Sequence, residues 1–132
     1  MKRFVLDTSA VLRLYLPDGP LPKGLESAVD LAGRGDAVLL APQLLLAEVA
    51  AVLLKKERAG TVNASDAEAI LKAVLDLPIT LRGHSELALE ALDVGRSEGL
   101  TSYDALFLVL ARREHAELLT GDMRLARRAG GG

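Results

Sequence analysis

The sequence predicts an α/β fold: a three-layer sandwich in which helices flank a short, mostly parallel β-sheet of about four to five strands. Short apolar runs alternate with longer segments of helical periodicity, and clusters of turn residues separate them. The chain has 132 residues, which fits a single domain over residues 1–132 with one core. Its composition, 50% hydrophobic and 26% charged, allows a sizeable core beneath a charged surface.

Four short apolar runs have the length and residue content of buried strands. The first run stops sharply at Asp7, Thr8 and Ser9, and the second stops at Pro42. Because helical segments separate the runs, consecutive strands are expected to form βαβ units and to run parallel. The expected strands are residues 2–6, 37–41, 78–81 and 117–120.

Seven segments between and after these strands are predicted to be helical. Pro17 ends the first helix and opens a turn-rich loop, and Gly60 is the expected C-cap of the third. Ser65 and Glu68 form a capping box at the start of the fourth. The tail, Gly130 to Gly132, is expected to be frayed. The expected helices are residues 9–16, 24–33, 43–59, 66–76, 85–98, 102–114 and 122–129.

Composition excludes several classes of protein. The chain has no cysteine, so disulfides, zinc–thiolate sites and catalytic thiols are excluded. Glu48 interrupts the apolar residues 37–54, and Asp7 and Arg13 interrupt the apolar start, so we expect a soluble, cytoplasmic protein. With 16 basic and 18 acidic residues the net charge is −2, so nucleic-acid binding would need a local basic patch.

Four carboxylates stand beside apolar segments at particular places. Asp7 ends the first strand, Glu48 lies inside the apolar helix LLLAEVAAVLL, Asp104 opens the helix SYDALFLVLA, and Asp122 follows the last strand. In an open α/β sheet, ligands gather beyond the carboxyl ends of the strands. We therefore expect the four acids to converge at that edge.

Converging carboxylates point to a bound metal ion. Like charges and burial both raise the pKa of a carboxyl group, and a divalent cation relieves both effects. Oxygen ligands, with no cysteine and no converging histidine, favour a hard ion, Mg²⁺ or Mn²⁺. Such an ion lowers the pKa of bound water and stabilises charge on a phosphoryl group, which suits phosphodiester hydrolysis.

Each acid also has a structural interpretation. Asp7 and Asp122 could cap the helices that follow them, and Asp104 lies three residues after Thr101, as in a capping box. Glu48 could form a buried salt bridge, because an acid inside an apolar helix needs a partner or a metal. A purely structural role for all four together is the weaker hypothesis.

Hydroxyl and guanidinium groups flank these acids. The hydroxyls could orient carboxylates or bound water, with ordinary helix capping as the alternative, which we prefer for Ser102. The arginines of the last helix either complement its C-terminus or contact a phosphate backbone at the rim of the site. The hydroxyl residues are Thr8, Ser9, Ser102 and Thr120, and the arginines are Arg124, Arg127 and Arg128.

The segments VLDTSAVL, LLLAEVAAVL, TSYDALFLVLA and LLTGDMRLA resemble the four acidic motifs of PIN domains. They look most like the VapC branch of bacterial and archaeal toxin–antitoxin systems, and the resemblance extends from Phe4 to about Ala129. It implies a parallel sheet flanked by helices and a set of metal-binding, catalytic acids with supporting hydroxyls. The implied acids are Asp7, Glu48, Asp104 and Asp122, and the implied supporting groups are Thr8, Ser9 and Thr120.

The resemblance also implies an activity and partners. It implies cleavage of RNA by metal-activated water, a homodimer, and inhibition by a small VapB-type antitoxin whose tail occupies the active-site groove. Family members commonly have a final strand after the last helix, whereas this sequence stops at RRAGGG. We therefore expect either a sheet one strand short or a truncated chain, with an uncovered edge available for pairing.

Two other functions fit part of the pattern. A PIN fold without useful catalysis could serve as an RNA- or protein-binding module, although the complete set of four acids argues against it. Phosphotransfer on a similar sheet is disfavoured: haloacid-dehalogenase-like phosphatases need an aspartate where Ser9 stands, and receiver domains need one within residues 77–83.

Overall fold

The computed structural model describes residues 1–130 and contains one four-stranded sheet in which every strand pair is parallel. The strand order is β3-β2-β1-β4. In the register, Phe4 of β1 pairs with Leu39 on one side and Glu117 on the other. The predicted α/β architecture is therefore confirmed. The strands are β1 (Lys2–Leu6), β2 (Ala37–Pro42), β3 (Ile79–Arg82) and β4 (Glu117–Leu119).

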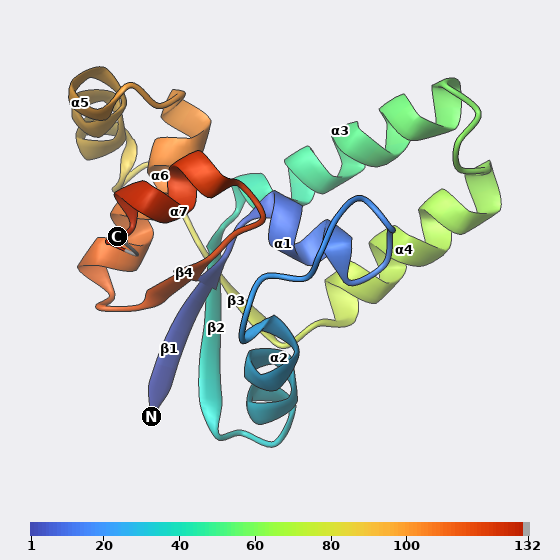
Figure 1. Ribbon diagram of the computed structural model, residues 1–132, viewed down its shortest axis with the longest axis horizontal. Helices are drawn as coiled ribbons and strands as arrows, with labels where there is room; N and C mark the ends of the chain where they lie inside the picture. Colours follow the sequence, from blue (N-terminus) through green and yellow to red (C-terminus); the bar gives the residue numbers. More distant parts are fainter. Residues whose placement is uncertain (131–132) are drawn as a thin grey trace.

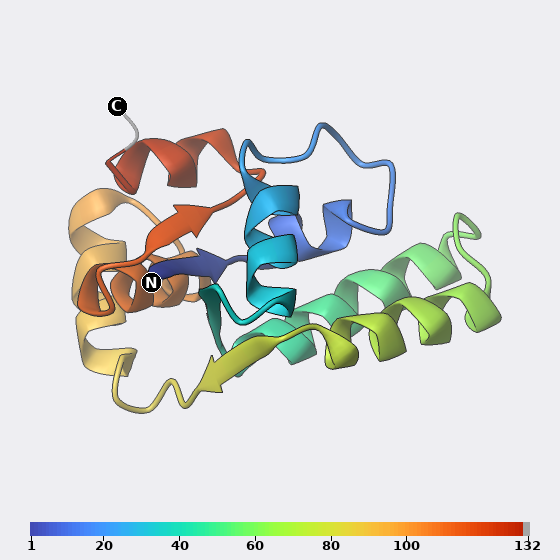
Figure 2. The ribbon, with the colours of Figure 1, turned by 90° about the horizontal axis from the view of Figure 1, so that it is seen from below.

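Helices cover the two faces of this sheet unequally. One face carries α6 (Ser102–Arg113), with α5 (Ala88–Glu98) packed outside it, and α2 (Leu25–Gly33) lies on the opposite face (Figures 1 and 2). α1 (Thr8–Arg13) continues directly from the end of β1. The resulting order of layers is helix, sheet and helix, as the sequence predicts.

A helical hairpin extends away from the sheet. α3 (Leu44–Arg58) and α4 (Ala64–Asp76) run side by side and project from the body of the molecule in both views (Figures 1 and 2). On the other side of α1, α7 (Met123–Arg128) packs on α6 beside the β4 edge of the sheet. Within residues 1–130 no further strand pairs with β4, so β4 is an edge strand of the sheet.

The core is centred on α6. Every side chain from Ala105 to Ala111 is buried, because this helix lies between the sheet and α5. In the sheet, the successive residues Val5 and Leu6 point to opposite faces and are both fully buried, so both faces of β1 are covered. A helix covered on opposite sides needs apolar residues all round, which explains the sequence ALFLVLA.

Some predicted boundaries are wrong. α1 ends at Arg13 rather than at residue 16, and a turn follows it before Pro17. The cap of α4 is Asn63, not Ser65, because the extended Asn63 accepts a hydrogen bond from the Asp66 N–H at 2.7 Å. The other boundaries lie within about three residues of expectation.

At the end of α3 the cap is Ala59, and Gly60 follows it with φ +80°. In the part of the chain that the structure describes, no helix is long and apolar enough to cross a membrane. Gly131 and Gly132, for which we expect fraying, lie outside the described residues.

The position of α6 predicts a contrast between two leucines. Leu108 is 1% exposed in the core, whereas Leu89 of α5 is 82% exposed. Leu108→Ala is expected to lower the free energy of unfolding by about 2–5 kcal/mol, because it leaves a cavity in the close-packed centre. Leu89→Ala is the matched control and should change it by less than about 0.5 kcal/mol. Urea unfolding measures both, and equal losses would contradict this account of the core.

Candidate active site

All four candidate acids line one pocket of about 530 Å³ at the carboxyl ends of β1 and β4. Asp7 follows β1, Glu48 comes from α3, Asp104 from the first turn of α6, and Asp122 from the start of α7. Residues distant in sequence thus meet at the edge where the parallel strands end. The structure brings the four acids together, while their chemical roles stay predictions.

Asp7 is the most deeply placed of the acids, at 6% exposed. It caps α1: its Oδ1 accepts hydrogen bonds from the Ala10 N–H at 2.9 Å and the Ser9 hydroxyl at 2.7 Å. Its Oδ2 accepts a hydrogen bond from the Thr120 hydroxyl. Burial raises the pKa of Asp7 against the opposing effect of these donors, and the nearby charge of Asp104 raises it further.

Among the described residues, the hydrogen-bond partner of Glu48 is a hydroxyl group and not a basic side chain. Its Oε1 accepts a hydrogen bond from the Thr8 hydroxyl at 2.5 Å, and among residues 1–130 no lysine or arginine forms a salt bridge with it. Partial burial raises the pKa of Glu48, and the charges of Asp104 and Asp7 raise it further. The alternative of a buried salt bridge is therefore wrong.

Asp104 contributes its backbone, rather than its carboxylate, to the cap of α6. Its N–H donates to the Thr101 hydroxyl at 3.1 Å, so the cap is Thr101, and Ser102 is the first residue of the helix. The pKa of Asp104 is raised by burial and by the charge of Asp122, whereas the charge of Arg124 lowers it. The Asp104 carboxylate interacts electrostatically with all three other acids.

Asp122 caps α7. Its Oδ1 accepts hydrogen bonds from the N–H groups of Arg124 at 2.9 Å and Leu125 at 3.2 Å. Both capping bonds use the same oxygen, and the side chain is exposed. Helix capping, the alternative role expected for Asp7 and Asp122, is thus present at both residues. At Asp122 the capping hydrogen bonds use Oδ1 and leave Oδ2 outside the cap.

Two hydroxyls connect Asp7 to the turn that carries Asp122. The Thr120 hydroxyl donates to Asp7 and accepts a hydrogen bond from the Asp122 N–H at 3.0 Å. The Ser9 hydroxyl donates to Asp7 and accepts one from the Gly121 N–H at 2.8 Å. Together with Thr8 on Glu48, each predicted supporting hydroxyl contacts a candidate acid directly or bridges two segments of the site.

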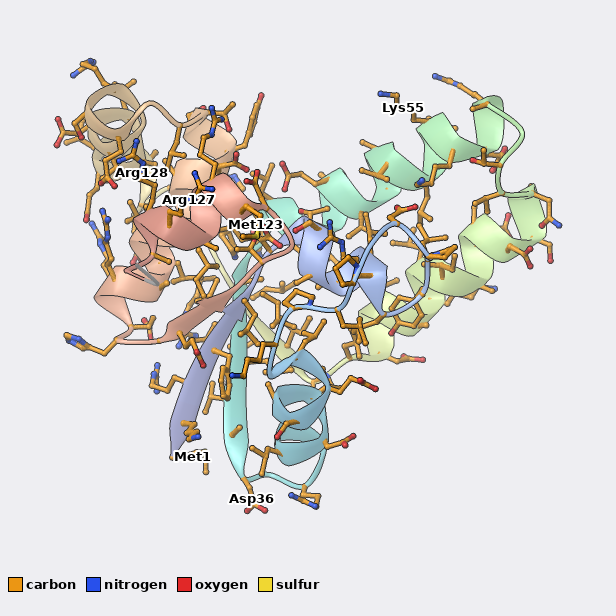
Figure 3. The ribbon with its side chains drawn as sticks, viewed as in Figure 1. Met1, Asp36, Lys55, Met123, Arg127 and Arg128 are labelled. Carbon is orange, nitrogen blue, oxygen red and sulfur yellow. The ribbon has the colours of Figure 1, made fainter. Side chains whose placement is uncertain are left out.

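The arginines of α7 lie outside the residues that line the pocket. Arg124 is close enough for its charge to act on Asp104. Arg127 and Arg128 lie farther from α1 than Met123 does, toward α5 (Figure 3).

Among the described residues, the basic side chain that does line the pocket is Arg13, which was not predicted from the sequence. The available signal was its place at the end of the helix that Asp7 caps.

The donor chemistry of the pocket suits a hard cation, since carboxylate and hydroxyl oxygens are its polar lining groups apart from Arg13. The carboxylates are not yet arranged as a metal site: among residues 1–130, no three carboxylates or histidines are close enough together to hold an ion. Burial first, and the neighbouring carboxylates second, raise the pKa values of Asp7, Glu48 and Asp104, so the protein by itself disfavours the ionised form of each.

Comparison with known proteins identifies the family. Residues 4–131 match the PIN domain family. The chain is 32% identical over 126 residues to ribonuclease VapC3 of Pyrobaculum aerophilum, covering 94% of this chain and 92% of that protein. It is also 32% identical over 126 residues to ribonuclease VapC1 of Mycobacterium tuberculosis, covering 96% and 90%.

A solved structure agrees with these sequence relatives. The crystal structure of PAE2754 from Pyrobaculum aerophilum superposes with a TM-score of 0.74 at 26% identity, covering 99% of this chain and 89% of that one. The four candidate acids lie within the span, residues 4–131, that matches the PIN domain family. The chain therefore belongs to the PIN-domain family.

Proposed function

We propose that this protein is a Mg²⁺- or Mn²⁺-dependent endoribonuclease and the toxin of a VapBC-type toxin–antitoxin pair. The observation that carries the proposal is the pocket in which four carboxylates converge without enough positive charge to balance them. The similarity to proteins named ribonuclease VapC supports RNA as the substrate.

The four acids are the residues that would hold the ion, although no three of them are already close enough to do so in the side-chain positions described for residues 1–130. A bound hard cation supplies Lewis-acid stabilisation of phosphoryl charge and lowers the pKa of water. The chain's own hydroxyls orient the acids: Thr8 holds Glu48, and Thr120 and Ser9 hold Asp7. Arg124 places positive charge near Asp104, at the rim where an RNA backbone would approach.

The family resemblance supports two partners besides RNA. We propose a VapB-type antitoxin that covers the acidic pocket, and a homodimer as the functional assembly. Sedimentation of the purified chain tests the dimer. Co-expression with the product of an adjacent short reading frame, followed by nuclease assay of the complex, tests inhibition.

The four-acid hypothesis predicts loss of cleavage on neutralising single acids. Asp7→Asn and Asp104→Asn are each expected to reduce the Mn²⁺-dependent cleavage rate of RNA by at least about 100-fold, because each removes a ligand rather than an outer partner. Glu68→Gln on the exposed face of α4 is the matched control and should retain activity. Full activity in both aspartate variants would refute the proposal.

The bridging position of Thr120 predicts a smaller effect. Thr120→Val removes the hydroxyl that donates to Asp7 and accepts from the Asp122 N–H, so cleavage is expected to fall by about 10–100-fold. Thr120→Ser keeps the hydroxyl and should stay within a few-fold of wild type. A loss in Thr120→Ser as large as that in Thr120→Val would contradict the assignment of the effect to the two hydrogen bonds, because Thr120→Ser keeps the hydroxyl and lacks only the methyl group.

Burial of Asp7 predicts an unusual dependence of stability on pH. Because its pKa is raised on folding, the stability it contributes is fully present below the pKa of the unfolded chain and is lost as pH rises through the folded pKa. In EDTA at neutral pH, Asp7→Asn should therefore melt at a higher temperature than wild type. The difference should vanish below about pH 4, near the ordinary aspartate pKa.

Saturating Mn²⁺ should reverse that order at neutral pH, because only the wild type retains the full ligand set. Thermal unfolding followed by circular dichroism measures both conditions. If the wild type has a higher melting temperature than Asp7→Asn in EDTA at neutral pH, the destabilisation that we attribute to the buried charge of Asp7 is absent.

A further inference from the structure

Arg13 has an unusual place in the pocket. Of the side chains within residues 1–130 that line it, five are acidic and Arg13 alone is basic; the acids are Asp7, Asp18, Glu48, Asp104 and Asp122. Asp18 forms a salt bridge with Lys56 of α3 at 3.1 Å. Within residues 1–130, by contrast, Arg13 forms no salt bridge. A cation that lines the same pocket as these carboxylates and forms a salt bridge with none of them is available to an anionic ligand.

The guanidinium of Arg13 is held between two glycines. A Cβ on Gly121 would lie 2.1 Å from Nη1 of Arg13, and a Cβ on Gly19 would lie 3.0 Å from its Cζ and Nη2. Its Nη1 donates a hydrogen bond to the carbonyl of Pro20 at 3.2 Å. The close approach at both positions requires residues without a side chain.

This contact fixes Arg13 relative to the candidate acids. Gly121 stands directly before Asp122, and its N–H donates to the Ser9 hydroxyl that in turn donates to Asp7. The guanidinium therefore contacts the turn at Gly121, which carries Asp122 and is linked to Asp7 through the Ser9 hydroxyl. Of its five N–H donors, one is used by Pro20 among the described residues, so others remain for a ligand.

The charge balance of the pocket indicates what that ligand is. When the four candidate acids are ionised they carry four negative charges, and one divalent ion supplies only two positive ones. A phosphodiester adds another negative charge, so a site for it needs a further cation. The planar guanidinium matches the geometry of phosphate oxygens and keeps its charge at any working pH.

We propose that Arg13 binds a phosphate of the RNA backbone beside the scissile bond and so positions the substrate over the acids. The inference rests on the proposed nuclease function. Arg13 is a substrate-binding residue in this account, and the glycine contacts hold its guanidinium in place before RNA arrives. The alternative is that Arg13 only fastens the loop of residues 17–24, through Pro20, to the turn at Gly121.

The salt dependence of RNA binding separates these roles. Fluorescence anisotropy of a labelled short single-stranded RNA, with Ca²⁺ as the hard cation, gives Kd across about 50–200 mM KCl. Arg13→Met keeps the aliphatic stem and removes the charge. We expect Kd to rise about 10-fold, as for loss of a charge-assisted hydrogen bond. The slope of log Kd against log salt should become shallower by about 0.7. Arg13→Lys should keep the wild-type slope.

Gly121→Ala gives a second test that keeps the charge. Its φ lies outside the left-handed region, so the added methyl group meets only the flexible end of Arg13 and must displace it. We expect weaker binding in the wild-type background and no further weakening when Arg13→Met is already present, since the displaced group is then gone. Arg34→Ala, in the exposed turn before β2, is the control with an unchanged Kd.

The outcomes distinguish this inference from the proposed function. An unchanged salt slope in Arg13→Met, together with a lowered melting temperature, would overturn the phosphate contact. Arg13 would then only hold the loop of residues 17–24 to the turn at Gly121, and this conclusion would not depend on whether the wild type cleaves RNA. A shallower slope without cleavage by wild type in Mn²⁺ would support the contact and overturn the nuclease assignment. Absence of RNA binding by wild type would overturn both.

Discussion

Burial of carboxylates close to one another in a single pocket is the constraint on which this site depends. Asp104 interacts electrostatically with each of the other candidate acids, and burial raises the pKa of Asp7, Glu48 and Asp104. The protein opposes this cost with neutral donors, the hydroxyls of Thr8, Ser9 and Thr120, which stabilise charge without cancelling it. This arrangement leaves the acids without a basic partner among residues 1–130, as the proposed cation site requires, whereas arginines paired with the acids would have balanced their charges within the protein itself.

The fold brings the four acids together through ordinary helix capping, because residues that follow the strands also begin the helices. Asp7 and Asp122 follow neighbouring parallel strands and cap α1 and α7, so their positions are set by backbone hydrogen bonds. Asp104 is placed by the Thr101 cap of α6, the helix at the centre of the core. Capping and metal binding are therefore compatible at these positions: capping holds the acid in place while leaving part of its carboxylate available.

The sequence predicted the parallel architecture, every strand and helix, and the meeting of the four acids, because strand length, helical periodicity and the shared edge of parallel strands are local or topological signals. It misplaced the cap of α4, since Asn63 and Ser65 are both good capping residues and only the backbone decides between them. It missed Arg13 because the significance of that side chain arises from Gly19 and Gly121, whose approach depends on tertiary structure.

The central claim is that a hard cation joins these carboxylates, and a crystal structure grown with Mn²⁺ at neutral pH, with anomalous scattering to locate the ion, tests it most directly. The account predicts a Mn²⁺ peak within the pocket that α1, α3, α6 and α7 surround. Its ligands should be carboxylate oxygens of Asp7 and at least one of Glu48, Asp104 and Asp122. A saturated crystal with no peak in this pocket, or with a peak that contacts none of these carboxylates, would contradict the account.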